Sequence, residues 1–321
     1  MRPGVTIIIP TYNRARLVPR SIDSVLAQTY PCSLVIVDDG STDDSAEVLR
    51  AYEGHPSVRV VRHPQNRGQS AARNTGIENV PAGTSYLGIL DSDDTLLTDA
   101  IEVLVGVFES SGDDYSQIFG WCQDMHTGEP TGTMIHREGL VTYQDALAGH
   151  LQGEFWQLVR RDVLGDLRFE ERARGGASGV WWRMLRERPG WLVPNVVRDY
   201  DRSGTDRISL RGFSRSAAGP TKWAVRAMID GPIGEDMRAQ FPRRYSGYLA
   251  ELAKWAALAG DREEARAASR EALRVAPSVR SAFMAVAILL PAPVVRRLVT
   301  TKRAGARVAE RFRPGTGATR T

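Results

Sequence analysis

The chain has 321 residues and a formal net charge of +4, and its hydrophobic (42%) and charged (25%) fractions are ordinary for a globular protein. Its length gives room for one large α/β domain with an extension and an ample core. Its two cysteines, Cys32 and Cys122, exclude a disulfide framework or a zinc cluster, so we expect a reducing, cytoplasmic compartment.

Strands and helices alternate along residues 1–112. We predict strands over Val5–Ile9, Leu34–Val37, Val58–Val61 and Tyr86–Leu90. We predict helices over Leu17–Gln28, from a cap at Ser41 or Thr42 to Tyr52, over Ala71–Glu78 and over Thr98–Phe108. This alternation predicts a doubly wound, mainly parallel sheet that is covered on both faces.

The pattern is looser over residues 113–216, where we expect the second half of the domain. The predicted strands are Ile118–Cys122, Thr133–His136 and Phe155–Val159, and the predicted helices are Thr142–Ala148 and Val180–Arg188. Residues 217–293 are alanine-rich and helical. Within them, Tyr245–Ala259 and Arg262–Val275 resemble one tetratricopeptide-like helix pair, which needs a partner to cover its apolar face.

The tail, residues 294–321, carries eight basic side chains and one acid, Glu310, and we expect it to be partly disordered. Behind the apolar Phe283–Leu290 it can sit on an anionic membrane at about 1 kcal/mol per charge. That stretch is too short to span a bilayer, and Val5–Pro10 is too short for a signal peptide. We therefore expect a soluble protein, or a peripheral one on the inner face of the cell membrane. Nucleic acid is not an expected partner, because no known binding module precedes the tail.

Three predicted strands end in polar motifs. These are Pro10-Thr11-Tyr12-Asn13-Arg14, Asp38-Asp39-Gly40-Ser41 and Asp91-Ser92-Asp93-Asp94. A fourth motif, Asn66-Arg67-Gly68, runs into Ala72-Arg73-Asn74-Thr75-Gly76. An apolar run that stops at acidic residues is typical of a buried parallel strand whose carboxyl end opens onto a site. Two such ends side by side can hold a nucleotide and its metal.

The order, spacing and residues of these four motifs resemble the nucleotide-sugar-binding half of family 2 glycosyltransferases, over residues 4–110. The resemblance implies a GT-A-like fold with a mixed, mainly parallel sheet, a donor-binding half and an acceptor-binding half. It implies an inverting, metal-dependent transfer from a nucleoside diphosphate sugar to a saccharide or lipid-linked acceptor, and the expected donor is a UDP-sugar. Cell-surface polysaccharide or glycolipid assembly is the usual setting. The glycine-rich loop that a dinucleotide oxidoreductase needs after its first strand is absent.

The resemblance places the nucleotide-sugar site on the residues that end these strands and on one helix arginine: Pro10, Thr11, Tyr12, Arg14, Asp38, Asp39, Arg73, Asp91 and Ser92. Asp39 is expected to accept the imide N–H of uracil, and Asp38 to orient the turn. An ordinary acidic turn is the alternative reading of this pair. Arg14 is expected to reach a phosphate, and a solvated arginine at a helix start is the alternative. By the resemblance, Arg73 is the cation that faces the nucleotide, and a helix-surface ion pair is the alternative.

Asp91-Ser92-Asp93 is the expected metal motif. Mn²⁺ and Mg²⁺ prefer oxygen ligands and take one or two carboxylates together with phosphate oxygens. We expect Asp93 to bind the cation directly and Asp91 to face the ribose or a metal-bound water. Asp94 is expected to cap the next helix. The cation would neutralise the charge that develops on the leaving diphosphate.

The catalytic base is not where the resemblance implies. Family members carry Glu-Asp six or seven residues before an Arg-Leu helix turn, and here that position falls on residues 176–178, which are Gly-Ala-Ser. Three explanations stay open: a displaced carboxylate such as Glu170 or Glu171, a base from elsewhere such as Asp124 or Asp206, or an impaired transferase. Glu171 is the first candidate because it lies on the loop that enters the helix. An impaired chain would be a nucleotide-sugar-binding scaffold with a helical interaction module.

Two further features belong to the second half. Arg198–Ser209 resembles the segment that ends the family's catalytic domain, where a histidine of many relatives assists the metal or diphosphate. None of the five histidines lies in this segment, so Arg202 or Arg207 is the expected phosphate contact. Trp156, Trp181 and Trp182 can stack on a sugar, although core packing is the commoner use of tryptophan.

Overall fold

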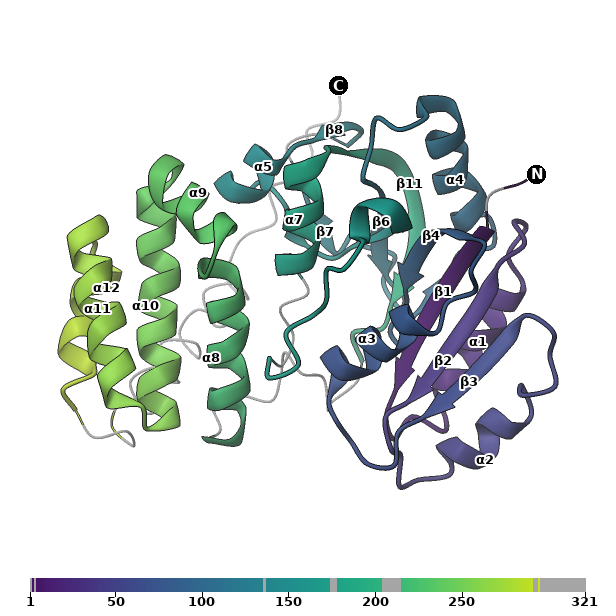
Figure 1. Cartoon of the computed structure of the whole chain (residues 1–321), viewed down its shortest axis with the longest axis horizontal. Helices are drawn as coiled ribbons and strands as arrows, with labels where there is room; N and C mark the ends of the chain where they lie inside the picture. The colour runs from purple at the N-terminus through teal and green to yellow at the C-terminus, as the bar shows by residue number, and fades with distance from the viewer. Residues whose placement is uncertain are drawn as a thin grey trace. The chain divides into compact units, whose positions relative to one another are not determined.

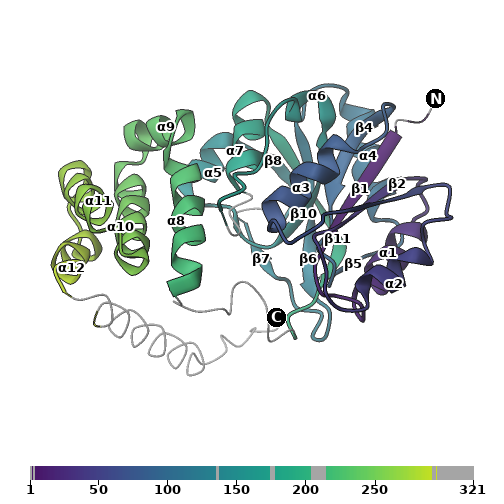
Figure 2. The ribbon, with the colours of Figure 1, turned by 60° about the horizontal axis from the view of Figure 1, so that its bottom comes forward.

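A computed structural model describes residues 2, 4–134, 137–173, 178–203, 215–290 and 294 of the chain. The chain divides into two compact units (Figures 1 and 2). The first holds residues 1–208 and 230–233, and the second holds residues 209–229 and 234–321. The first unit is an α/β domain, and the second is helical.

A mixed sheet forms the centre of the α/β unit. Among the described residues it has nine strands, eight of them in the order β3-β2-β1-β4-β10-β6-β11-β5, and β8 also pairs with β11. The parallel half comprises β1 (Gly4–Thr11), β2 (Ser33–Asp38), β3 (Val58–Arg62) and β4 (Thr84–Ile89). The other half comprises β5 (Thr95–Leu96), β6 (Gln117–Asp124), β8 (Gly139–Val141), β10 (Phe155–Arg160) and β11 (Gly190–Tyr200). β10 runs antiparallel to β4 and β6, whereas β11 is parallel to β6.

Helices cover both faces of this sheet. One face carries α1 (Val18–Leu26), α2 (Ser45–Arg50) and α4 (Ala100–Ser111), and the other carries α3 (Gln69–Glu78), α6 (Arg161–Leu164) and α7 (Ser178–Glu187). Successive strand residues point to opposite faces, so Ile7 and Ile9 of β1 pack on the first set and Ile8 on the second. All three are fully buried, which is why β1 reads as an unbroken apolar run. Gly76 lets α3 approach β1, since a Cβ there would lie 2.3 Å from Ile8 Cγ2.

The predicted doubly wound, mainly parallel sheet is therefore confirmed, and most predicted elements lie within two residues of the observed ones. The cap predicted at Ser41 or Thr42 is wrong, because α2 begins later, after Asp44. The strand predicted over Thr133–His136 is observed as the short β7 (Gly132–Thr133), which pairs with β9 (Gln152–Gly153); residues 135–136 lie outside the described residues. The helix predicted over Thr142–Ala148 is observed as α5 (Tyr143–Ala148), and Thr142 caps it with a reciprocal capping box.

The longest strand, β11, was not predicted. Its pairing with β6 shifts register between Leu192 and Val196 and again before Arg198, so the strand is irregular around Pro194. Charged residues at its end, Arg198 and Asp199, further hide the strand pattern. Packing against β6 and α4, rather than local propensity, makes this segment a strand.

The helical unit contains α8 (Arg215–Ile229), α9 (Pro232–Gln240), α10 (Pro242–Ala259), α11 (Arg262–Val275) and α12 (Val279–Ala287). The predicted helix pair is observed as α10 and α11. Its apolar face is covered by α8 and α12, both of which contact α10 (Figure 1). The contacts are largely between alanines, and Lys222 of α8 pairs with Glu264 of α11 at 2.6 Å.

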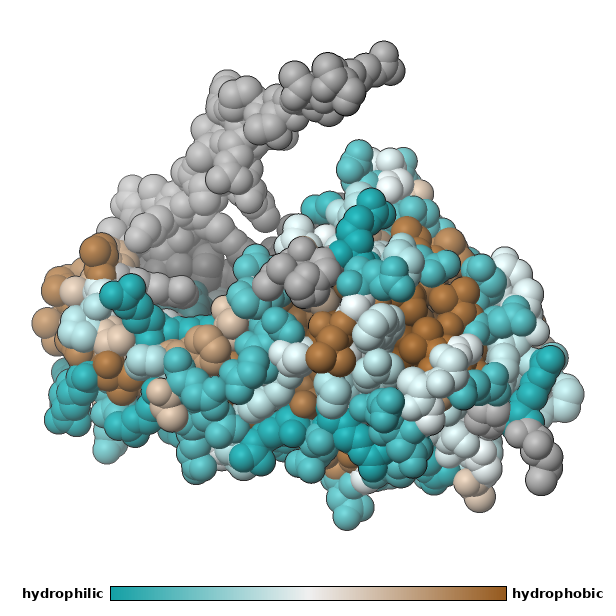
Figure 3. Space-filling view, turned by 90° about the horizontal axis from the view of Figure 1, so that it is seen from above, coloured by the Kyte–Doolittle hydropathy of each residue, from teal (hydrophilic) through white to brown (hydrophobic). Residues whose placement is uncertain are grey.

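One face of α12 is apolar and exposed. Val279, Val286 and Leu289 at or just past this helix are 88%, 64% and 65% exposed. In Figure 3, apolar residues gather at the left end of the molecule, on the side of α11 and α12. Among the described residues no helix is both long and apolar enough to cross a membrane. The predicted basic tail lies outside the described residues, apart from Val294.

Candidate active site

The carboxyl ends of β2, β1 and β4 meet at one edge of the sheet. Thr11 pairs with Asp38, and Ile8 pairs with Ile89, so the three strands end at neighbouring positions. The amide of Asp39 donates to the Thr11 carbonyl at 2.9 Å, which carries the β1–β2 pairing one residue further. Three of the four sequence motifs therefore lie at one edge.

The carboxylate of Asp39 is buried and held by a loop. The backbone amides of Arg67 and Gly68 donate to its two oxygens, at 2.8 and 2.7 Å. Gly68 has φ +98°, a conformation that favours glycine, and this places its N–H on the carboxylate. His63, after β3, donates from Nδ1 to Asp39 Oδ1 at 2.7 Å, and its Nε2 lies 2.9 Å from Thr75 Oγ1.

Asp39 thus has three donors among the described residues. A carboxylate has about four acceptor positions, so one is left for an N–H of a ligand. Its expected role as base reader fits this geometry, although His63 was not predicted as its partner. The only signal for His63 in the sequence is its position at the end of the third strand.

Asp38 and Asn13 shape the turns beside this carboxylate. Asp38 Oδ1 accepts from the Ser41 amide at 2.9 Å and closes the turn after β2. Asn13 has φ +53°, and its amide donates to Ser41 Oγ at 2.9 Å while its Oδ1 accepts from the Thr42 amide at 2.8 Å. Ser41 and Thr42 therefore tie the end of β1 to the turn after β2 and do not cap a helix.

The first motif places its residues at different depths. Pro10 and Thr11 are buried, and Thr11 Oγ1 has no hydrogen-bond partner among the described residues. Tyr12 is 41% exposed, so its ring is available to a ligand. The Arg14 amide donates to Ser45 Oγ at 3.0 Å, and its guanidinium lies within electrostatic range of Asp93.

The predicted metal motif follows β4 directly. Asp91 Oδ1 accepts from Gln69 Nε2 and from the Arg73 guanidinium, both at 3.1 Å, so α3 orients this carboxylate. Arg73 itself stacks over the ring of Phe169 at 5.5 Å. Burial and the neighbouring Asp91 raise the pKa of Asp93, and Arg14 opposes them. Ser92, between the two acids, is buried.

A divalent cation fits this pair of acids. Burial and the charge of Asp91 both raise the pKa of Asp93, and a cation between the two carboxylates would relieve their repulsion. No group of three metal-ligating side chains occurs in the part of the chain that the structure describes. Mn²⁺ and Mg²⁺ sites that complete their coordination with phosphate oxygens and water need only one or two carboxylates.

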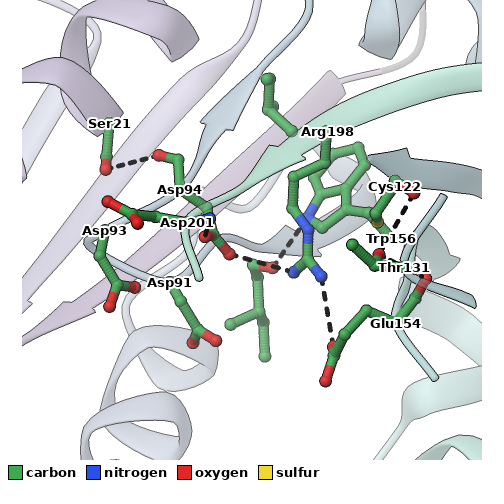
Figure 4. A network of polar contacts seen from close by, with 12 residues as sticks. Ser21, Asp91, Asp93, Asp94, Cys122, Thr131, Glu154, Trp156, Arg198 and Asp201 are labelled. Atoms are coloured by element: carbon green, nitrogen blue, oxygen red, sulfur yellow. Dashed lines mark hydrogen bonds and ion pairs between the residues drawn. The ribbon is translucent and has the colours of Figure 1, made fainter. Parts of the chain in front are cut away.

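Behind the metal motif lies a buried ionic network (Figure 4). Asp94 is fully buried; its Oδ1 accepts from the Asp201 amide at 2.9 Å, and its Oδ2 lies 3.4 Å from the Arg198 guanidinium. Burial raises the pKa of Asp94 to about 8, although Arg198 opposes it. The expectation that Asp94 caps the next helix is wrong, because the residue before α4 is Asp99.

Arg20 of α1 links this network to the loop Asp91–Asp94, which carries the predicted metal motif and is called the metal loop below. Its guanidinium donates to the Asp93 carbonyl and to Asp201 Oδ2, the latter at 2.5 Å. Ser21 Oγ donates to the Asp94 carbonyl at 2.6 Å. Burial raises the pKa of Asp201, but hydrogen bonds from Ser203 and Arg20 outweigh it and hold that pKa well below its usual range. The metal loop is therefore fixed from α1 and from the end of β11.

The structure brings a histidine to this segment although the sequence shows none. His126 Nε2 lies 3.4 Å from Asp201 Oδ1. Arg202, expected at phosphate, lies 3.6 Å from Asp124. Arg207 is outside the described residues.

The candidate bases have different surroundings. Glu171 accepts from Asn74 Nδ2 and from the Arg67 guanidinium, both at 3.2 Å, which draws it to α3 and to the loop that holds Asp39. Glu170 pairs with Arg172, whose hydrogen bonds lower its pKa. Asp124 accepts from the two amides of the turn that follows it, which lowers its pKa. Asp206 and residues 176–177 lie outside the described residues.

Two of the three tryptophans serve the core. Trp156 is 2% exposed, and its Nε1 donates to the Ile89 carbonyl at 2.8 Å. Trp182 is also buried. Trp181 meets the edge of Phe169 at 5.4 Å and is half-buried. Trp156 and Trp182 therefore pack in the core and are not available to stack on a sugar.

A family model and several known proteins match this chain. The model of the family described as "Glycosyl transferase family 2" matches residues 6–167, half of the chain. A Campylobacter jejuni protein named GalNAc(5)-diNAcBac-PP-undecaprenol beta-1,3-glucosyltransferase is 25% identical over 222 residues, covering 67% of this chain and 70% of that protein.

Two solved structures share the fold. Staphylococcus aureus TarS 1-349 in complex with UDP-GlcNAc matches with a TM-score of 0.62 at 15% identity, covering 94% of this chain and 92% of the other. The mannosyltransferase PcManGT from Pyrobaculum calidifontis, in complex with GDP-Man and Mn²⁺, matches with a TM-score of 0.54 at 21% identity, covering 95% and 85%. At these identities the likeness establishes the GT-A-type fold.

Proposed function

Because this chain belongs to glycosyltransferase family 2, we propose that it is an inverting, metal-dependent transferase that uses a UDP-sugar and a saccharide or lipid-linked acceptor. The observation that carries this proposal is the pairing of a buried, loop-held Asp39 with the acids Asp91 and Asp93 at one sheet edge. Family membership makes the chain an enzyme rather than a binding scaffold. The solved relatives support the donor and metal classes, as one holds UDP-GlcNAc and the other Mn²⁺.

The donor would lie along this edge. Asp39 accepts the base N–H with its remaining acceptor position, and Tyr12 supplies an exposed ring beside it. Arg14 and Arg73, on either side of the acids, attract the diphosphate. Asp93, with Asp91, would hold the cation, which when bound neutralises the charge that develops on the departing diphosphate.

Transfer with inversion is a single displacement. The acceptor hydroxyl attacks the anomeric carbon on the side opposite the diphosphate. A carboxylate at the same edge takes the hydroxyl proton, because a sugar hydroxyl is a poor nucleophile near neutral pH. Glu171 and Asp206 are the candidates that the sequence supplies, and they stay predictions.

The setting is proposed to be cell-surface polysaccharide or glycolipid assembly at the cytoplasmic face of a membrane. The Campylobacter relative, by its name, acts on an undecaprenol-linked saccharide, which supports a lipid-linked acceptor. The exposed apolar face of α12 and the basic residues that follow it in sequence support peripheral binding to an anionic bilayer.

A thermal-shift titration with UDP, with and without Mn²⁺, tests the donor and metal sites. At a UDP concentration of about 100 Kd the fold should gain about 2.7 kcal/mol. Asp93→Asn should remove most of the Mn²⁺ dependence. It should not lower the ligand-free melting temperature, because burial and the neighbouring Asp91 disfavour the charge of Asp93 in the folded state. Asp99→Asn, an exposed acid after the same loop, is the matched control. An unchanged melting temperature with every nucleoside diphosphate tried would refute the proposal.

A further inference from the structure

The family's position for the catalytic base holds no carboxylate here, so the proton acceptor must come from another place at the same edge. Most acidic side chains at this edge already accept hydrogen bonds from other residues of the protein. Asp39, Asp91 and Asp201 each accept from two or more donors. Glu171 has a donor on each of its oxygens, and both donors belong to α3 or to the loop before it.

Glu154 lies at this edge and was not expected from the sequence. It precedes β10, which runs antiparallel to β4 with Leu158 opposite Gly88. Continuing this register past the paired residues brings Glu154 level with Ser92 of the metal motif. The hydrogen bond from Trp156 Nε1 to the Ile89 carbonyl holds this part of β10 against the end of β4.

The order of the strands sets the order of the groups along the edge. Asp39 follows β2, the metal motif follows β4 two strands away, and Glu154 precedes β10 one strand further. Neighbouring strands are about 4.8 Å apart. A nucleotide sugar bound with its base at Asp39 and its diphosphate at Asp93 therefore carries its sugar toward Glu154. Glu171, held by Arg67 and Asn74, lies on the nucleoside side instead.

One oxygen of the Glu154 carboxylate is held by a hydrogen bond, and the other is accessible. Its Oε2 accepts from the Arg198 guanidinium at 3.3 Å, and Arg198 also faces Asp94 of the metal loop at 3.4 Å. Among the described residues, Oε1 of Glu154 has no hydrogen-bond partner, and the side chain is 48% exposed. Figure 4 shows Glu154 below the Arg198 guanidinium and joined to it by a dashed line, with Asp91 farther to the left. A buried arginine thus fixes one oxygen and leaves the other to a substrate.

We propose that Glu154 is the catalytic base and that Arg198 is its positioning residue; this rests on the inverting transfer proposed above. The acceptor hydroxyl gives its proton to Glu154 Oε1 as its oxygen forms a bond to the anomeric carbon. The bond from that carbon to the diphosphate oxygen breaks, and its electron pair leaves with UDP. A base oriented by a third group is the general arrangement for activating a weak nucleophile.

The test compares Glu154→Gln with Glu171→Gln in full-length protein. UDP release from UDP-glucose and from UDP-N-acetylglucosamine is measured with Mn²⁺ and with water as acceptor, since a general base also activates water. Glu154→Gln should lower kcat at least 100-fold, with the UDP-induced rise in melting temperature unchanged. Glu171→Gln should lower kcat less than tenfold. Glu154→Asp, which keeps the carboxylate, should recover part of the loss.

A fall of less than tenfold in Glu154→Gln, with an active wild type, overturns the inference. A wild type that binds UDP but releases none from either sugar also overturns the inference. A wild type that binds no UDP refutes the proposed function itself and this inference with it.

Discussion

His63 is the buried side chain that completes the Asp39 site. Because His63 supplies a donor to Asp39 Oδ1, we expect His63→Asn to weaken UDP binding by about tenfold, which corresponds to about 1.4 kcal/mol. The shorter amide cannot reach both Asp39 and Thr75, so the carboxylate loses its fixed orientation. Titration calorimetry with UDP measures the effect. His55→Asn, an exposed histidine before β3, is the control, and equal affinities for the two variants would contradict this role.

The sequence predicted the position of an acid at the sheet edge where the acid follows a strand that is visible locally. Asp39 and Asp93 follow apolar strands, and the carboxyl ends of parallel strands meet whatever lies between them in the chain. The partners of these acids were not predictable in the same way. Arg198 reaches Asp94 only because β11 inserts beside β6, and His63 reaches Asp39 because β3 lies next to β2. The acids of the site can therefore be located from the local sequence pattern. The groups that orient them come together only when the sheet is assembled.

At the scale of elements, Asp201 joins the end of β11 to α1. Its folded-state pKa is held below the ordinary 3.8 by hydrogen bonds that outweigh burial, so it contributes stability above about pH 4 and loses that contribution as the pH falls. At pH 7, Asp201→Asn should lower the free energy of unfolding by about 1–3 kcal/mol. The gap between variant and wild type should narrow below about pH 4.

Thermal melts from pH 3 to pH 8 follow this gap. Asp44→Asn, an exposed acid whose side chain caps nothing, should stay within about 0.5 kcal/mol of the wild type. A constant gap across the whole pH range would show that the Asp201 carboxylate does not act through its charge.

Elements were predictable where period and composition agree. β1, β2 and β4 are continuous apolar runs, and α1 has one apolar face, so each was found. β11 was missed because Pro194 and Arg198 interrupt its pattern, and its pairing with β6 is irregular. The start of α2 was misplaced because Ser41 has the chemistry of a cap, but its hydroxyl accepts from Asn13 instead.

At the scale of the whole chain, we expect the C-terminal segment to bind anionic bilayers. Deleting the residues after Val294 removes eight basic side chains and should move the protein from the liposome pellet to the supernatant. The attraction should weaken with salt, because screening acts over about 8 Å at physiological ionic strength. Val286→Ser on the exposed face of α12 should weaken binding without changing its salt dependence.

Co-sedimentation with phosphatidylserine vesicles measures both effects, and pure phosphatidylcholine vesicles are the control. Equal sedimentation of the full-length and truncated proteins on the anionic vesicles would argue against a membrane role for the tail.

The architecture was predictable as a whole because four motifs in order identify the family, and the family fixes the sheet. The second half of the α/β unit was less predictable from the sequence. The placement of β10 antiparallel to β4, and with it the position of Glu154, follows from long-range pairing that no local pattern encodes. The expected base therefore could be seen to be missing from the sequence, but its replacement could be sought only in three dimensions.

The strand order also determines how long some residues wait for their partners during synthesis. β4 and Asp94 leave the ribosome early, whereas β10, which covers the open side of β4, and Arg198, which faces Asp94, come much later. At about 5–20 residues per second, Asp94 waits roughly 5–20 s for its counter-ion. Until β10 is made, within that interval, β4 presents an unpaired strand edge, the kind of surface on which nascent chains aggregate. The nascent chain is therefore most prone to aggregate while β4, which lies at the centre of the finished sheet, is still an edge strand.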